Sequence, residues 1–338
     1  YLNKIRKVRR RQYTAAEYTE HILKGDITVL SQAVTLIESN LFDHQALAQE
    51  VIEKCLPYAG NSVRVGITGV PGSGKSTSID AFGLHVLKRG GKLAVLAIDP
   101  SSELSKGSIL GDKTRMEKLS VADNAFIRPS PSAGSLGGVA RKTRETIVLC
   151  EAAGFDNIFV ETVGVGQSET AVHSMVDFFL LIHLAGTGDE LQGIKRGIME
   201  MADGIVINKA DGNNIEKAKL AQAHFRNALH LFPPTPSGWI PQVLTYSGYY
   251  EIGIGEVWNM IDEYIAFVKK NGYFEHKRQE QAKYWMLETI NDQLKSHFYQ
   301  NSEIVSLLQE KENRVLHSIQ SPFTAAKEVL DFYFGKIL

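Results

Sequence analysis

The chain has 338 residues, which is more than one hydrophobic core usually organises, so we expect one α/β domain with helical additions. Its formal net charge is −1 and 43% of its residues are hydrophobic, a balance that argues against nucleic-acid binding as its main function. The two cysteines, Cys55 and Cys150, are too few for a disulfide framework or a thiolate metal site, which favours a reducing cytoplasm.

Residues 1–60 form the first predicted unit, a helical N-terminal extension. Six basic residues without an acid open it, and we interpret them as a solvated helix start or as an arm that meets a partner. Apolar residues then recur at helical spacing, and no strand pattern precedes Val63. The chain does not begin with Met, which is compatible with a trimmed N-terminus. If the chain is trimmed and comes from a eukaryote, we expect the mitochondrial matrix instead of the cytoplasm.

A glycine-rich segment matching G-x-x-x-x-G-K-[ST] follows an apolar strand pattern at 63–68. Its residues are Gly69, Val70, Pro71, Gly72, Ser73, Gly74, Lys75 and Ser76, and Thr77 comes next in the helix that the sequence predicts over 76–89. Glycines let backbone N–H groups curl around an anion, and the helix offers its positive end. The segment therefore predicts a P-loop NTPase in which Lys75 reaches the β- and γ-phosphates and Ser76 ligates Mg²⁺.

Acids at the ends of two further strands are candidates for sensing the γ-phosphate. Asp99 follows the strand at 93–98 as a candidate metal or water-activating carboxylate; the alternative is a turn cap before Pro100. Asp112 lies in a polar loop and would approach the metal only when that loop closes. Glu161 ends the strand at 157–161 and would hold Mg²⁺ through water, unless it forms an ordinary ion pair, while the Gly164 N–H would touch the γ-phosphate.

The tetrapeptide Asn208-Lys209-Ala210-Asp211 follows the apolar strand at 204–208. The Asp211 carboxylate can accept hydrogen bonds from N1–H and the 2-amino group of guanine, which adenine lacks. The Lys209 stem can cover the base, and near Ser247 the backbone N–H of Gly248 can meet the guanine oxygen. We therefore expect GTP rather than ATP as the ligand.

Strand patterns at 63–68, 93–98, 124–128, 157–161, 178–184, 204–208 and 242–246 alternate with helical patterns. This alternation predicts a mostly parallel sheet flanked by helices over a GTPase domain at 61–270. Residues 271–338 form a predicted helical C-terminal arm, and its last helix begins at Ser321-Pro322. No stretch reaches the uninterrupted apolar length of a membrane helix, so we expect no membrane association.

These motifs, together with the glycine-rich segments at 134–140 and 185–197, resemble the MeaB/ArgK family of P-loop GTPases over about residues 13–270. The resemblance implies a GTPase chaperone that gates cofactor delivery to, and protects, adenosylcobalamin-dependent methylmalonyl-CoA mutase. It assigns Asp189 and Lys195 to a third switch loop that responds to the mutase; a plain surface turn is the alternative. It also implies a homodimer held by the C-terminal arm, whose apolar stripe could instead pack on the chain's own core.

Two other functions remain open from the sequence. The first is an energy-coupling ATPase that serves lysine, arginine and ornithine import, which the guanine-type residues Asn208 and Asp211 disfavour. The second is a metal-insertion GTPase, which the lack of clustered histidine and cysteine ligands disfavours.

Overall fold

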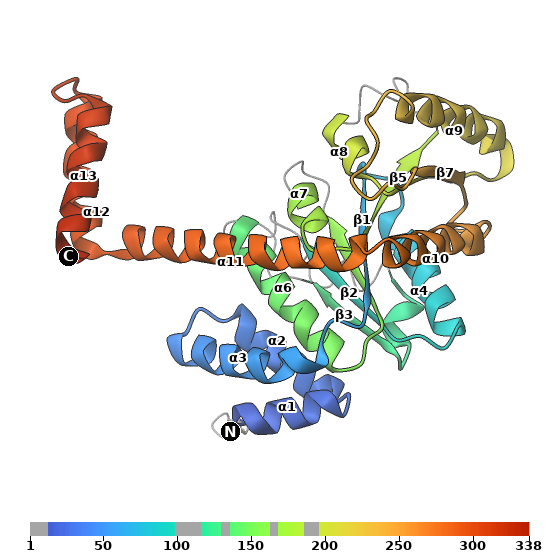
Figure 1. Cartoon of the computed structure of the whole chain (residues 1–338), viewed down its shortest axis with the longest axis horizontal. Coiled ribbons are helices and arrows are strands. Elements are labelled where there is room, and N and C mark those ends of the chain that lie inside the picture. Colours follow the sequence, from blue (N-terminus) through green and yellow to red (C-terminus); the bar gives the residue numbers. More distant parts are fainter. Residues whose placement is uncertain (1–12, 99–115, 130–135, 163–167, 186–195, 338) are drawn as a thin grey trace, which may run out of the picture. The chain divides into compact units, whose positions relative to one another are not determined.

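The computed structural model describes residues 13–98, 116–129, 136–162, 168–185 and 196–337. Among these residues, seven strands form one sheet in the order β3-β2-β4-β1-β5-β6-β7, and every neighbouring pair is parallel. The α/β class predicted from the alternation is confirmed (Figure 1). The strands are β1 (Val63–Gly69), β2 (Leu93–Ile98), β3 (Ala125–Pro129), β4 (Asn157–Thr162), β5 (Phe178–Leu184), β6 (Gly204–Asn208) and β7 (Gln242–Thr245).

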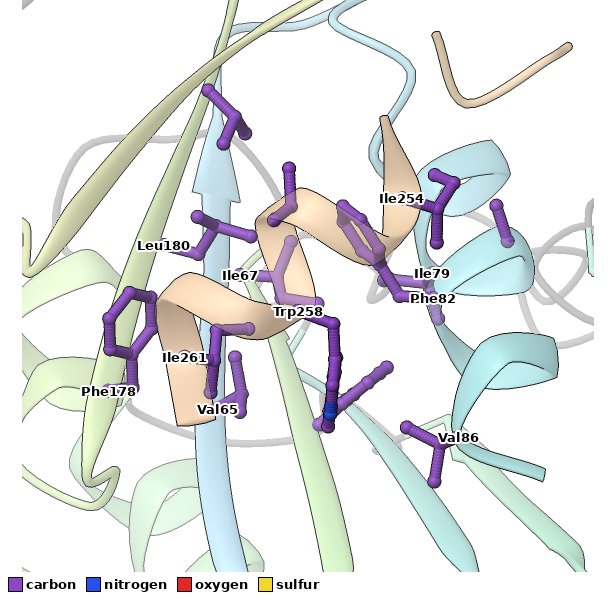
Figure 2. Packing of buried hydrophobic residues seen from close by; sticks show 14 of the residues in the cluster. Val65, Ile67, Ile79, Phe82, Val86, Phe178, Leu180, Ile254, Trp258 and Ile261 are labelled. Carbon is purple, nitrogen blue, oxygen red and sulfur yellow. The ribbon is translucent and has the colours of Figure 1, made fainter. Parts of the chain in front are cut away.

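One face of the sheet carries an extensive apolar cluster (Figure 2). Alternate residues of the central strand β1, Val65 and Ile67, point into it beside Phe178 and Leu180 of β5. Helices α4 (Lys75–Lys88) and α10 (Ile254–Lys270) close this face with Phe82 and Trp258 among others. The helix that follows the glycine-rich loop is thereby fixed against the sheet.

The opposite face is covered by α6 (Leu136–Ala152), α7 (Ser168–His173), α8 (Arg196–Met201) and α9 (Ile215–Leu229). Side chains pack closely on this face of β1: a Cβ on Gly66 would lie 2.9 Å from Val172 of α7, 2.9 Å from Val176 and 2.8 Å from Phe179 of β5. Only glycine fits there, because real Cβ atoms do not approach that closely. Short 3₁₀ turns at Leu56–Tyr58, Leu119–Val121 and Gly212–Asn214 complete the connections in the described residues.

Three helices precede the sheet: α1 (Ala15–Leu23), α2 (Ile27–Glu38) and α3 (Phe42–Cys55). Thr14 and Glu17 form a reciprocal capping box at the start of α1, and the Asp26 carboxylate caps α2. Helix α2 is tied to the end of β3 by the ion pair between Glu38 and Arg128. The helical character predicted for this part of the chain is therefore observed from Ala15 onward.

Charged groups are buried at the edge of the sheet where the strands begin. Arg64 donates from Nε and Nη2 to the two carboxylate oxygens of Glu151, at 2.8 and 2.9 Å. Asp177, which directly precedes β5, accepts the Arg64 backbone N–H at 2.8 Å. Arg278 donates to both Asp177 oxygens, at 2.9 and 2.7 Å, and also to the carbonyls of Gly60 and Ser62. We call Arg64, Glu151, Asp177 and Arg278 the amino-edge network.

Arg278 belongs to α11 (Tyr273–Gln300), whose first turns contact the segment between α7 and β5. Lys277 Nζ donates to the Asp177 carbonyl and Gln281 Nε2 donates to the Val176 carbonyl, both at 2.8 Å. The start of α11 is thus part of the unit that contains the sheet, which extends to Gln281.

Residues 282–338 form a second compact unit, made of the rest of α11, α12 (Ser302–Leu316) and α13 (Pro322–Ile337). The predicted start of the last helix at Ser321-Pro322 is observed. A small cluster of Ile304, Val329 and Tyr333 holds α12 and α13 together. Many large apolar side chains of this unit stay exposed, among them Met286, Ile290, Leu294, Leu316 and Phe323. Among the described residues, no helix has the length and apolar character needed to span a bilayer.

Candidate functional site

The glycine-rich loop connects the end of β1 to the start of α4, as its spacing predicts. Gly72 and Gly74 have φ of 79° and 86°, in the left-handed region that favours glycine, and Gly74 is the N-cap of α4. A Cβ on Gly69 would lie 2.2 Å from the Ile182 carbonyl oxygen of the neighbouring strand. The loop therefore needs its glycines for backbone geometry, and that geometry turns a helix N-terminus toward the edge where the strands end.

Lys75 begins α4, and its ammonium lies over the loop. Its Nζ donates to the Gly69 carbonyl at 2.9 Å and to the Val70 carbonyl at 3.5 Å. Burial lowers the pKa of Lys75, and the charges of Glu161 and Glu169 oppose that shift. Both glutamates are buried, each 5% exposed. The loop thus holds one cation beside two buried acids.

Ser76 and Glu161 come together at the ends of α4 and β4. The Ser76 Oγ lies 3.5 Å from Glu161 Oε1. A hydroxyl and a carboxylate are hard oxygen ligands, and Mg²⁺ in phosphate sites usually takes one or two of them with phosphate and water completing its shell. These two side chains therefore fit a magnesium ion, whereas the next residue, Thr77, is exposed.

Asn208, at the end of β6, joins the loop to the opposite side of the site. Its Nδ2 donates to the Ser73 carbonyl at 2.8 Å, and its Oδ1 accepts the Gly248 N–H at 3.0 Å and the Lys209 N–H at 2.7 Å. The Asn208 side chain is 3% exposed. The amide thus fixes the glycine-rich loop and the segment after β7 with one set of hydrogen bonds.

Asp211 and Ser247 face each other across the same edge of the sheet. The Ser247 Oγ donates to Asp211 Oδ2 at 2.6 Å, and the Ser247 backbone pairs with Ile252. Lys209 adopts a φ of 60°, which turns the chain between Asn208 and Asp211. The carboxylate predicted to bind a base follows β6 and is therefore held by a residue that follows the neighbouring strand β7.

Five of the residues assigned from the sequence lie outside the described residues: Asp99, Asp112, Gly164, Asp189 and Lys195. Arg196, next to Lys195, begins α8 and pairs with Glu200 at 3.1 Å while its guanidinium lies 5.4 Å from the Phe232 ring centroid. Sequence reasoning missed Glu169, the buried acid near Lys75. Its signal is weak because an acid in the first turn of a helix is common for dipole reasons alone.

The sequence of this chain matches a known protein family. The profile described as "Methylmalonyl Co-A mutase-associated GTPase MeaB" matches residues 30–303. The chain belongs to the MeaB family. This MeaB-family GTPase hydrolyses GTP to GDP and phosphate, and its ligands are guanine nucleotides.

Relatives of this MeaB-family GTPase are similar over almost the whole chain. A "Putative GTPase" of Caulobacter vibrioides is 48% identical, covering 94% of this chain and 97% of its own length. "GTPase ArgK" of Escherichia coli is 43% identical, with 94% and 96% covered. The mouse "Methylmalonic aciduria type A homolog, mitochondrial" is 44% identical, with 91% and 77% covered.

A solved structure shows the same fold. The "Crystal structure of LAO/AO transport system kinase" superposes with a TM-score of 0.76 at 37% identity, covering 96% of this chain and 98% of that one. The P-loop GTPase fold predicted from the sequence is therefore confirmed.

Proposed function

We propose that this GTPase holds the guanine base with Asn208, Lys209, Asp211, Ser247 and Gly248, and the phosphates with residues 69–77. The observation that carries the proposal is the Asn208 amide, which bonds to the Ser73 carbonyl on one side and to the Gly248 N–H on the other. A nucleotide spans base and phosphates, so a site for it needs both halves in fixed register. Asp211 supplies the acceptor for N1–H and the 2-amino group of guanine.

Hydrolysis then depends on charge at the loop. Lys75 stabilises the negative charge that develops on the β- and γ-phosphates, and the backbone N–H groups before α4 contribute in the same direction. Mg²⁺ would be held by Ser76 directly and by Glu161 through water, with Asp99 and Asp112 as further carboxylates and Gly164 at the γ-phosphate. When bound, the ion would neutralise phosphate charge.

We further propose that GTP hydrolysis serves an adenosylcobalamin-dependent methylmalonyl-CoA mutase, gating cobalamin delivery and protecting the enzyme. The family description and the name of the mouse relative support this partner. Asp189 and Lys195 are the proposed elements that respond to it.

The exposed apolar side chains of residues 282–338 support a homodimer through that unit, because an apolar face of this extent is normally covered. Both cysteines are free thiols, which supports a reducing compartment, the cytoplasm or, in a eukaryote, the mitochondrial matrix.

The test is GTP turnover by the purified chain with and without the mutase. We expect slow basal hydrolysis that the mutase accelerates, and Lys195→Ala should remove most of the increment while leaving nucleotide binding intact, since a positive charge supplied at the transition state is worth about 10³ to 10⁵ in rate. Lys219→Ala is the matched control, because Lys219 is an exposed lysine paired with Glu216. Equal turnover of ATP and GTP, unaffected by the mutase, would favour the transport ATPase instead.

A further inference from the structure

Tyr246 is a buried tyrosine between β7 and α10 to which the sequence assigns no role. Its side chain is 1% exposed and its ring stacks on that of Phe82 in α4, with centroids 5.4 Å apart and planes at 27°. Its backbone N–H donates to the Ile207 carbonyl, and its own carbonyl accepts the Ala210 N–H, both at 3.0 Å. The main chain of Tyr246 is thus hydrogen-bonded to the residue before Asn208 and to the residue after Lys209, in the segment proposed to bind the base.

The side chain of Tyr246 reaches the other half of the site. Its hydroxyl lies 2.6 Å from the Oγ of Ser78, which is fully buried one turn into α4. Ser78 Oγ donates its single hydrogen to the Gly74 carbonyl at 2.8 Å, so the tyrosine must donate to the serine. Burial raises the pKa of Tyr246, which keeps the phenol protonated and able to donate.

These bonds form a second connection between the two halves, beside that of Asn208. Ser78 Oγ also lies 3.4 Å from Asn208 Nδ2. This serine oxygen is therefore within hydrogen-bond distance of both the Tyr246 hydroxyl and the Asn208 amide. Gly248 packs against the same serine, since a Cβ there would lie 3.2 Å from Ser78 Oγ. A shift of the segment after β7 would therefore break the Tyr246 bond and disturb Gly248 together.

We propose that Tyr246 is a positioning residue for nucleotide recognition: its hydrogen bond to Ser78 holds residues 208–211 and 247–248 in register with the phosphate loop. The proposal rests on the nucleotide site described under the proposed function and adds to it a residue that touches no part of the nucleotide. Asp211 is held by Ser247, the neighbour of Tyr246, so the carboxylate that recognises the 2-amino group depends on this register.

The test is Tyr246→Phe, which keeps the stacked ring and removes one hydroxyl. Calorimetric titration with GDP and with inosine diphosphate, which lacks the 2-amino group, measures affinity and base discrimination separately. We expect GDP binding to weaken about threefold to tenfold, as for the loss of one buried hydrogen bond, and the preference for GDP over inosine diphosphate to shrink. Ser78→Ala should weaken binding at least as much, because it also removes the contacts of Ser78 Oγ with the Gly74 carbonyl and Asn208 Nδ2. The double variant should bind like Ser78→Ala alone, because the Tyr246 bond is already lost there.

Tyr264→Phe is the matched control. Tyr264 is equally buried in the same core, and its hydroxyl bonds to Asp203 away from the nucleotide site. If Tyr246 only stabilises the fold, Tyr246→Phe would lower the melting temperature and reduce the affinities for GDP and inosine diphosphate by the same factor. The reason is that the substitution would then change only the fraction of protein that is able to bind. That result, or unchanged affinities, overturns the proposal, whereas failure of the wild-type chain to bind GDP overturns the proposed site itself.

Discussion

Replacing Asn208 by alanine should both weaken the fold and detach the base-reading segment from the phosphate loop. The substitution leaves the Ser73 carbonyl and the Gly248 N–H buried without their partner. Each unsatisfied buried group costs about 1 to 3 kcal/mol, so we expect the free energy of unfolding to fall by about 2 to 6 kcal/mol. Because the two halves of the site then move independently, GDP affinity should fall by at least about tenfold.

Urea unfolding followed by circular dichroism measures the first effect, and calorimetric GDP titration measures the second. Asn208→Asp separates the two bonds, since the carboxylate still accepts the Gly248 N–H but repels the Ser73 carbonyl. Asn214→Ala is the matched control, because this half-buried asparagine makes one solvent-exposed bond, to the Lys209 carbonyl. An Asn208→Ala variant with the wild-type unfolding free energy and GDP affinity would show that this amide does not join the halves.

Three further predictions concern charge. Lys75→Ala should slow GTP hydrolysis by about 100-fold or more in single-turnover assays, because it removes preorganised charge from the phosphates; near-normal turnover would show that Lys75 is not there. Arg278→Ala should lower the free energy of unfolding by about 3 kcal/mol, since Asp177 is buried, whereas Arg89→Ala, which removes an exposed ion pair, should change it by less than about 1 kcal/mol. Burial, with the Lys277 charge nearby, lowers the pKa of His173 to about 4. In the unfolded chain the His173 pKa is about 6.5, so below that pH the unfolded chain binds a proton that the folded chain does not. The free energy of unfolding therefore falls as the pH drops from about 6.5 toward 4, by about 2 kcal/mol at pH 5. His173→Gln should abolish this part of the pH dependence in urea unfolding.

The strands could be predicted closely because buried parallel strands are continuous apolar runs. Leu93–Ile98 and Phe178–Leu184 begin and end where the pattern predicts. β3 was predicted at 124–128 and runs from Ala125 to Pro129, since its sequence is only partly apolar and gives no sharp boundary. Strand limits are thus readable where every side chain is buried and less so at the edge of a sheet.

The contacts inside the site could not be predicted in the same way. The spacing of Gly69 to Ser76 encodes a local turn, so the sequence alone reveals it. The bond of Asn208 to Ser73 joins positions 135 residues apart, and that of Tyr246 to Ser78 joins positions 168 residues apart. No local pattern records such pairs, because they arise only when the sheet brings β6 and β7 beside the glycine-rich loop.

The amino-edge network and the proposed nucleotide site lie at opposite ends of the same strands: β1 begins beside Arg64 and ends at Gly69. Loss-of-function variants of this GTPase should therefore divide into two classes. Changes near Arg278 or Asp177 should reduce the amount of folded protein without altering the nucleotide site. Saturating nucleotide should therefore restore the folding of these variants. A ligand at 100 times its dissociation constant adds about 2.7 kcal/mol, close to the loss expected for Arg278→Ala. Changes at Asn208 or Tyr246 should damage the proposed nucleotide site itself, so added nucleotide should rescue these variants far less.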